Sequence, residues 1–243
     1  MIERYRDLVV IYENDVAYVI SCDSLGAIGN KEHDVLKVDE EIVGRTTVKV
    51  ALSEVLCVGA KPLVISDTLS VEMNPTGQKV LRGIKSELEE NGLSDVVFTG
   101  STEENFPTSM TGIGITVIAK ANIGDLKIKK VKTGMHVSIL GYPRVGSEVL
   151  SSNDVLTLKD YVKISNSKEI VEAIPVGSKG IKYEIGILEK ISGLKVEANF
   201  PQHLDVLKSG GPSTCCLVVH SEEDTASIKG LTDKPLTYVG VLI

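Results

Sequence analysis

Tryptophan is absent from this sequence, and phenylalanine occurs only three times in 243 residues. The core must therefore be built largely from Val, Ile and Leu. Long apolar runs are absent too, because no segment approaches the roughly 20 apolar residues of a membrane span. The N-terminus lacks the layout of a signal peptide. We therefore expect a cytoplasmic protein with no membrane partner.

Cysteine and histidine are equally sparse, with four of each. The cysteines are Cys22, Cys57, Cys215 and Cys216, and none of them forms a CxxC pair. We expect buried, reduced thiols, since disulfides and metal sites need other spacings or compartments. The histidines show no HExxH or paired spacing, so neither a zinc site nor a Ser–His nucleophile pair is supported.

Positive charge is in deficit, and the net charge is −7. No Lys/Arg cluster with interleaved aromatic residues is present, which argues against a nucleic-acid partner. An acidic protein can still bind a nucleotide if its carboxylates hold a divalent cation that neutralises the phosphates. The hydrophobic share of 42% and the charged share of 24% are typical of a globular protein.

Apolar periodicity predicts loosely alternating strands and helices. The predicted strands are residues 7–12, 16–21, 63–71, 96–99, 112–120, 136–141, 214–220 and 236–242. The predicted helices are residues 40–58, a segment from the 74–77 turn to Asn91-Gly92, and residues 179–192. No long parallel βαβ series occurs, so we expect an α+β protein with mixed sheets. A charged connector at 125–131 suggests two domains, residues 1–124 and 125–243.

Three acidic residues stand at or near the ends of predicted elements in the first half. Asp15 lies between the first two strands, Asp23 follows the second, and Glu54 lies in the first helix. Magnesium usually takes one or two carboxylates together with substrate phosphates, and strand ends collect at one edge of a sheet. The alternative, which the spacing alone favours, is that these acids are solvated turn residues.

Two glycine-containing segments offer a second type of candidate. The run Gly100-Ser101-Thr102-Glu103-Glu104-Asn105 is predicted to be a loop after a strand, where backbone N–H groups can bind phosphate. It would otherwise be a polar turn that caps the next element. Lys179, in Gly177-Ser178-Lys179-Gly180, precedes a predicted helix and could meet an anion. An ordinary helix cap is the alternative there, because the GxxxxGK[ST] spacing is absent.

In order and content, several segments resemble the superfamily of aminoimidazole-ribonucleotide synthetase, thiamine-monophosphate kinase, selenophosphate synthetase and the hydrogenase-maturation carbamoyl dehydratase. Asn14-Asp15-Val16-Ala17 is similar to the family's GDDAA turn, and Cys22-Asp23-Ser24-Leu25 to its TDTL segment. The most specific stretch, residues 51–63 (ALSEVLCVGAKPL), resembles NLSDIAAMGARPL. Weaker similarities follow at residues 99–102 (GGDT), 178–181 with 192–193 (SDGL…SG) and 207–218 (GGEDYELL).

The resemblance implies two α/β domains (PurM-like), with N-terminal domains that pair in a homodimer and bind ATP through Mg²⁺. By this resemblance, Asp15, Asp23 and Glu54 take metal–nucleotide roles. For phosphoryl transfer we further expect nucleotide contacts by Asn14, Gly100, Ser101, Thr102 and Asn105, and catalytic roles for Lys179, Asp67 and Glu103. Lys179 would neutralise transferred charge, and Asp67 or Glu103 would orient the acceptor hydroxyl. Several family aspartates are replaced, by Asn14, Glu54, Ser101 and Lys179, and the C-terminal half is shorter than usual.

Within the superfamily, residues 72–77 (EMNPTG) and 99–105 (TGSTEEN) look like the α-ribazole kinases of Gram-positive bacteria. This resemblance implies a small-molecule kinase that acts on a nucleoside-like acceptor, the ribose 5′-hydroxyl of α-ribazole, in cobalamin salvage. Two alternatives stay open. One is another ATP-dependent reaction of the superfamily, such as thiamine-monophosphate phosphorylation. The other is a catalytically degenerate dimer that only binds nucleotide, which the missing aspartates favour.

Overall fold

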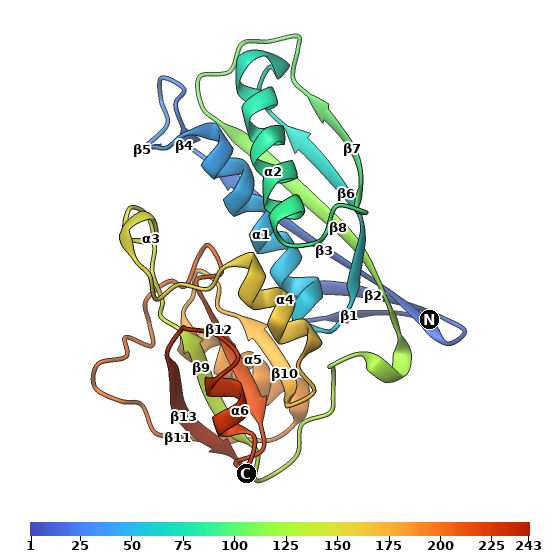
Figure 1. Ribbon diagram of the computed structural model, residues 1–243, viewed down its shortest axis with the longest axis vertical. Helices are drawn as coiled ribbons and strands as arrows, with labels where there is room; N and C mark the ends of the chain where they lie inside the picture. Colours follow the sequence, from blue (N-terminus) through green and yellow to red (C-terminus); the bar gives the residue numbers. More distant parts are fainter. The chain divides into compact units, whose positions relative to one another are not determined.

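A computed structural model describes all residues, 1–243, and the chain divides into two units (Figure 1). Unit 1 comprises Met1–Val55 and Ala60–Ile123, and unit 2 comprises Leu56–Gly59 and Gly124–Ile243. Each unit contains its own β-sheet with packed helices. The expected α+β class with a mixed N-terminal sheet is therefore confirmed.

Unit 1 is built on a six-stranded sheet in the order β1-β2-β3-β8-β6-β7. Its strands are β1 (Ile2–Tyr5), β2 (Leu8–Glu13), β3 (Val16–Gly26), β6 (Lys61–Leu69), β7 (Val97–Thr102) and β8 (Gly112–Asn122). Neighbouring strands are antiparallel, except that β6 and β7 are parallel. The short parallel strands β4 (Ile28–Gly29) and β5 (Leu36–Lys37) lie outside this sheet.

Helices α1 (Glu40–Cys57) and α2 (Gln78–Glu90) run side by side on one face of this sheet (Figure 1). Their backbones approach closely because two glycines lie at the contact. A Cβ atom at Gly83 would overlap the backbone of Glu41, and one at Gly44 would overlap the carbonyl of Val80. A single π-type turn, Met73–Gly77, leads into α2.

Unit 2 holds an antiparallel five-stranded sheet in the order β10-β12-β9-β13-β11. These strands are β9 (His136–Gly141), β10 (Ile170–Pro175), β11 (Val196–Ala198), β12 (Cys215–His220) and β13 (Leu236–Leu242). The helices are α3 (Glu148–Ser151), α4 (Leu158–Asn166), α5 (Ile181–Ser192) and α6 (Thr225–Lys229). Every residue of β12 is buried, as expected for a central strand covered on both faces.

The last turn of α1 belongs to unit 2, where it contributes a buried thiol. Cys57 Sγ lies 3.8 Å from Cys216 Sγ, and both side chains are buried. Nearby, Lys127 Nζ donates to the carbonyls of Ile164 (2.7 Å) and Ser167 (2.5 Å). Burial lowers the pKa of Lys127 to about 8. No disulfide forms, but the expectation that every thiol is buried is wrong for Cys22, which is exposed on β3.

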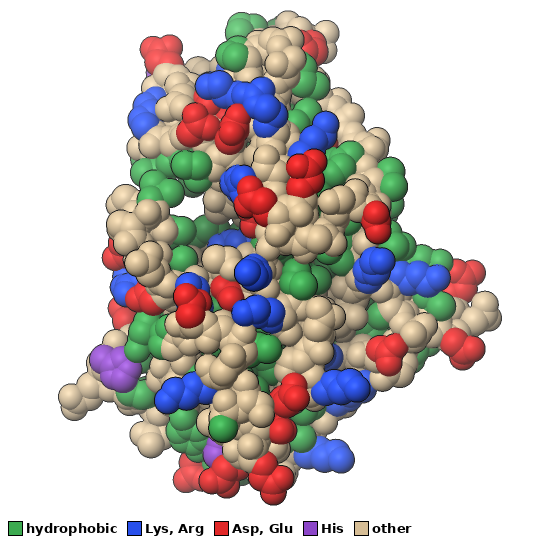
Figure 2. All heavy atoms as spheres, in the orientation of Figure 1, with side chains coloured by type: hydrophobic (Ala, Val, Ile, Leu, Met, Phe, Trp, Pro, Cys, Tyr) green, Lys and Arg blue, Asp and Glu red, His purple; other side chains and the backbone are tan.

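The surface of the molecule bears no single dominant charged patch on the face drawn in Figure 2, where Lys and Arg alternate with Asp and Glu. Such a mixed pattern differs from the basic stripe of a protein that binds a nucleic-acid backbone. None of the helices combines the length and the hydropathy needed to cross a bilayer.

Candidate active site

A row of four residues crosses the sheet of unit 1 near the end of β3. Asp23 on β3 pairs with Ile115 on β8, which pairs with Asp67 on β6, which in turn pairs with Gly100 on β7. Directly paired residues place their side chains on the same face of a sheet. This face is the one that α1 covers, because Ser21 on β3 donates a 2.7 Å hydrogen bond to the carbonyl of Ala51. Asp23 and Asp67 therefore share a face under the helix layer.

The carboxylates of Asp23 and Asp67 are both partly buried, and no cation contributes to their pKa values. Burial raises the pKa of Asp23 to about 6, and only the N–H of Ser24 acts in the opposite direction. Asp67 is 5% exposed, and burial likewise raises its pKa against a hydrogen bond from its own backbone. Two carboxylates that are costly to ionise form a place where a divalent cation is favoured.

Gly100 makes the position of Asp67 possible. A Cβ atom at residue 100 would overlap both carboxylate oxygens of Asp67. Gly100 has an ordinary extended backbone within β7, so the requirement for glycine here is space and not a positive φ. The sequence predicted that residues 100–102 form a loop, and this is wrong, because β7 continues through Thr102.

Glu54, the third predicted metal ligand, is engaged by a neighbouring arginine. Arg6 Nη2 lies 3.8 Å from Glu54 Oε2, and their side chains are only 4% and 20% exposed. A carboxylate that already faces a partly buried guanidinium is a weaker magnesium ligand, because its charge is offset. Arg6 lies in the turn between β1 and β2, with a positive φ of 55°, and nothing in the sequence patterns pointed to it.

Asp15 does not join Asp23. Asn14 and Asp15 form the turn between β2 and β3, and Asn14 has a positive φ of 54°. Asp23 lies eight residues further along an extended strand, which separates the two Cα atoms by roughly 26 Å. No group of three or more His, Cys, Asp or Glu residues in the chain could hold a metal ion. The expectation that Asp15, Asp23 and Glu54 surround one ion is therefore wrong, because a straight strand separates the first two.

The acids of the segment after β7 shape its backbone. Glu103 accepts hydrogen bonds from the N–H groups of Asn105 (2.7 Å) and Phe106 (3.1 Å), which lower its pKa. Glu104 accepts from the N–H of Met73 (2.7 Å) and the hydroxyl of Thr102 (2.8 Å). These carboxylates hold a turn beside the row, and Ser101 and Asn105 are exposed.

A buried aspartate that the sequence patterns did not reveal anchors the loop preceding β8. Asp34 is 5% exposed and accepts hydrogen bonds from Lys31 N (2.9 Å), Thr111 N (2.8 Å) and Thr111 Oγ1 (2.7 Å). Lys31 in turn pairs with Glu72 (2.5 Å) and donates to the carbonyl of Thr108 (3.0 Å). This network fixes the segments that flank the polar end of the sheet.

Replacing Asp34 by Asn is expected to destabilise the protein by about 1–3 kcal/mol at pH 7, because hydrogen bonds to a buried carboxylate are lost. Burial alone would raise the pKa of Asp34, but the hydrogen bonds from Thr111 and Lys31 outweigh it and lower the pKa. The stabilisation is therefore present above pH ~4 and lost as the pH falls through the lowered pKa. Urea unfolding at several pH values measures it.

The exposed Asp95→Asn is the matched control for this experiment and should leave the unfolding free energy within about 0.5 kcal/mol. An equal loss of stability at pH 7 and at pH 3 would contradict the assignment to the ionised carboxylate of Asp34.

Lys179 lies in unit 2, immediately before α5, as the sequence predicted. Its side chain is exposed, and Nζ lies 4.3 Å from the ring centroid of Tyr183, a cation–π contact. Gly180, with φ of 79°, separates it from the first helical residue. The amine is accessible to an anion, but its present partner is the aromatic ring.

Asp23 and Asp67 supply the carboxylate oxygens that Mg²⁺ prefers as ligands. Magnesium usually takes one or two protein carboxylates, and phosphates and water complete its coordination. Neighbouring strands lie about 4.8 Å apart, so two aspartates separated by one strand have Cα atoms roughly 10 Å apart. The Asp67 carboxylate lies over Gly100 on β7, on the side away from β3, so a bound group that contacts both acids must extend across β8 and β6, as a magnesium–triphosphate can.

Known proteins share this fold. Residues 5–121 match the family model "AIR synthase related protein, N-terminal domain". The search of curated proteins found no match to this sequence. Among solved structures, thiamine monophosphate kinase from Aquifex aeolicus is 16% identical with a TM-score of 0.68, covering 98% of this chain and 88% of that one.

Two further structures share the fold, and both are described as complexes with a nucleotide or nucleotide analogue. A complex described as AaThiL with AMPPCP and TMP is 17% identical with a TM-score of 0.69, covering 97% of this chain and 84% of that chain. Thermotoga maritima PurL complexed with ATP is 17% identical with a TM-score of 0.58, covering 98% of this chain and 37% of that chain. The N-terminal part of the chain, residues 5–121, therefore matches the AIR synthase-related family, and the chain as a whole has the fold of these structures.

Proposed function

We propose that the chain is an ATP-dependent kinase that transfers a phosphoryl group to a hydroxyl of a small molecule. The observation that carries the proposal is the pair Asp23 and Asp67, two carboxylates on one face of the sheet whose pKa values burial raises and no cation offsets. Two proteins of the same fold support it, because their structures contain AMPPCP with TMP and ATP, respectively.

In this proposal Asp23 and Asp67 hold Mg²⁺ on the triphosphate. The ion supplies neutralisation of phosphate charge, the main requirement of phosphoryl transfer. Gly100 keeps Asp67 in position, and the Glu103 turn fixes the segment beside the row. The sequence suggests that Asp67 orients the acceptor hydroxyl, but its place in a row with Asp23 favours a role in metal binding. Lys179 remains a proposed counter-charge for the transferred group.

The proposed acceptor is a nucleoside-like molecule, and α-ribazole is the first to test because residues 72–77 and 99–105 resemble α-ribazole kinases. We expect ADP release that needs both Mg²⁺ and one acceptor from a panel of α-ribazole, thiamine monophosphate and common nucleosides. Mass spectrometry of the product identifies the phosphorylated hydroxyl. ADP release with thiamine monophosphate alone would transfer the proposal to that acceptor.

A degenerate nucleotide-binding protein is the second candidate, favoured by the ion pair between Arg6 and Glu54 at a predicted metal position. Calorimetry with ATP separates the two. Binding that depends on Mg²⁺ without ADP release from any acceptor would support the degenerate protein. No binding of ATP at all would contradict both candidates.

A homodimer through unit 1 is also proposed, as the superfamily resemblance implies. The sheet face opposite α1 carries apolar side chains that the single chain leaves open. Ile2 is 72% exposed, Val9 38% and Val97 63%, and they lie on β1, β2 and β7. Exposed apolar side chains spread over one sheet face are typical of a protein–protein interface.

A further inference from the structure

Three loops of unit 2 emerge at the same end of its five-stranded sheet. Gly141, the last residue of β9, pairs with Cys215, the first residue of β12, and Pro175, the last of β10, pairs with Cys216. The loops that leave these positions therefore start side by side. They are residues 142–157, 176–180 and 199–214.

Glycines bring the second and third of these loops into direct contact. A Cβ atom at Gly180 would come within 2.8 Å of the backbone of Leu207, and one at Gly210 within 2.7 Å of the Val176 side chain. Lys182 N also donates to the Val206 carbonyl at 2.9 Å. The third loop is thereby fixed in place by close backbone packing.

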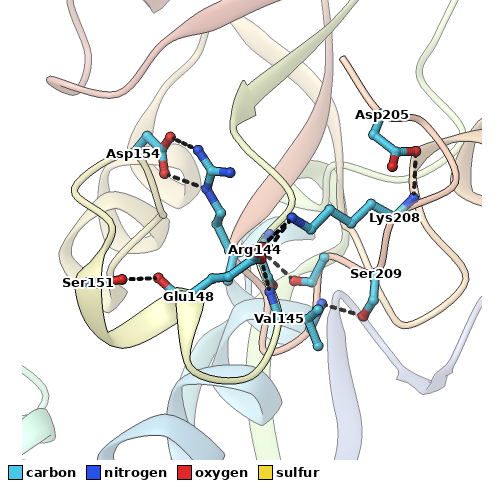
Figure 3. Close-up of polar contacts among 11 residues, drawn as sticks. Arg144, Val145, Glu148, Ser151, Asp154, Asp205, Lys208 and Ser209 are labelled. Atoms are coloured by element: carbon cyan, nitrogen blue, oxygen red, sulfur yellow. Dashed lines mark hydrogen bonds and ion pairs between the residues drawn. The ribbon is translucent and has the colours of Figure 1, made fainter. Parts of the chain in front are cut away.

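The first loop is attached differently, because residues 144–155 include no buried residue. This segment contains α3, and Val145 and Leu150 are 45% and 56% exposed. The ion pair of Arg144 with Asp154 closes the segment on itself, whereas Lys208 of the third loop pairs with Glu148 at 2.7 Å and connects the segment to that loop (Figure 3). At its start, Arg144 N also donates to Thr214 Oγ1 (3.0 Å). A segment without buried apolar contacts opens at little cost in free energy.

Arg144 and Lys208 can each donate a hydrogen bond to an anion larger than a carboxylate. Arg144 bonds Asp154 through Nε (3.1 Å) and Nη2 (2.5 Å), which leaves Nη1 outside the pair. Lys208 Nζ bonds Glu148, and its backbone N–H is held by Asp205 (Figure 3). The Lys208 and Glu148 side chains are 25% and 46% exposed, so a solvent-borne anion can reach them.

We propose that these loops form a binding site for a phosphate monoester dianion and that residues 144–155 are its lid. The phosphate takes the place of Glu148 on Lys208 and accepts a second hydrogen bond from Arg144 Nη1. A dianion with three acceptor oxygens competes well with a single carboxylate for ammonium and guanidinium groups. A partly exposed ion pair contributes little free energy, so replacing Glu148 on Lys208 by phosphate costs little.

This site does not depend on the kinase proposal, because it involves only residues of unit 2 and requires no turnover. The same phosphate chemistry occurs in a phosphorylated small molecule and in a nucleotide. The test therefore uses three probes without added metal: inorganic phosphate, ribose 5-phosphate and AMPPCP. A preference for ribose 5-phosphate indicates a monoester substrate or product, and a preference for AMPPCP indicates the nucleotide.

Two variants with opposite expected effects test the site by calorimetry. Lys208→Gln should weaken binding of the best probe about tenfold, because a charge-assisted hydrogen bond is lost. Glu148→Gln should strengthen binding about threefold or more, because a competing carboxylate is removed. Lys195→Gln, which breaks the exposed pair with Glu189 elsewhere in unit 2, is the matched control and should change nothing.

Hydrogen exchange of residues 144–155 provides a second measurement. We expect Glu148→Gln to speed exchange in the free protein and the bound probe to slow it. If both variants bind the probes as the natural chain does, or if no probe binds at millimolar concentration, the proposal is overturned. A structural ion pair alone would give equal losses of stability in both variants and no change in affinity.

Discussion

Asp23→Asn is expected to lower ADP formation by about two orders of magnitude while the fold persists. The change removes a charged oxygen that we assign to magnesium, and loss of a group that stabilises developing phosphate charge acts on the chemical step. Steady-state ADP release at saturating ATP and Mg²⁺ measures the effect. In the natural chain at subsaturating Mg²⁺, activity should also fall as the pH drops below about 6, because protons then compete with the cation for the carboxyl.

The same substitution should make the protein more stable. Burial raises the pKa of Asp23 from 3.8 to about 6, so the folded state binds a proton more tightly than the unfolded state. Ionised Asp23 therefore destabilises the fold above pH 6, and this cost disappears as the pH falls toward 4. Urea unfolding in a chelator should show Asp23→Asn more stable by about 1–3 kcal/mol at pH 7.5 and equal at pH 3.5.

Magnesium gives the control for this assignment. Millimolar Mg²⁺ should raise the Tm of the natural chain and leave that of Asp23→Asn nearly unchanged, since only an ionised pair binds the cation. Asp7→Asn, on the exposed turn before β2, is the matched variant and should respond to Mg²⁺ as the natural chain does. Unchanged turnover in Asp23→Asn would remove this residue from the site.

Gly100→Ala is expected to reduce both stability and turnover. The added methyl group would overlap the carboxylate of Asp67, which is 5% exposed and cannot move freely into solvent. Such overpacking typically costs about 1–3 kcal/mol. Displacement of a metal-binding carboxylate by an ångström is enough to lower turnover roughly a hundredfold. Thermal unfolding and ADP release measure the two effects.

A double variant separates these effects. Gly100→Ala with Asp67→Ala removes the overlap, so it should be more stable than Gly100→Ala alone but should remain inactive. Gly26→Ala on β3 is the control, because a Cβ there has nothing within 4 Å. A fully active Gly100→Ala would contradict the role given to Asp67.

The elements with strong periodicity were predictable from the sequence. Helix α1 ends at Cys57, and Gly59 with φ of 76° terminates it, as the glycine before Pro62 predicted. The hairpin of β2 and β3 follows from two Val/Ile-rich runs around Asn14. Helix α4 was missed because nine residues with mixed polarity give a weak pattern, although Thr157 and Asp160 form a capping box.

The candidate site was only partly predictable. Asp23 and Asp67 were both named from the sequence, but for different roles. Their common row depends on β8 lying between β3 and β6, which local patterns do not encode. The partners Arg6 and Asp34 escaped for the same reason, since each acts across many intervening residues. Asp15 was misplaced because a turn acid and a strand-end acid look alike until the strand direction is known.

Helix α1 is shared between the two units, because its final residues, Leu56–Gly59, group with the second. Cutting the chain after Ile123 would separate Cys57 from Cys216 and leave this stub with an uncovered apolar end. Either half expressed alone should therefore be unstable or prone to aggregation unless residues 56–59 are redesigned. Deletion mapping, a common way to assign activities to separate domains, will be misleading for this molecule; point substitutions in the intact polypeptide are the sounder approach.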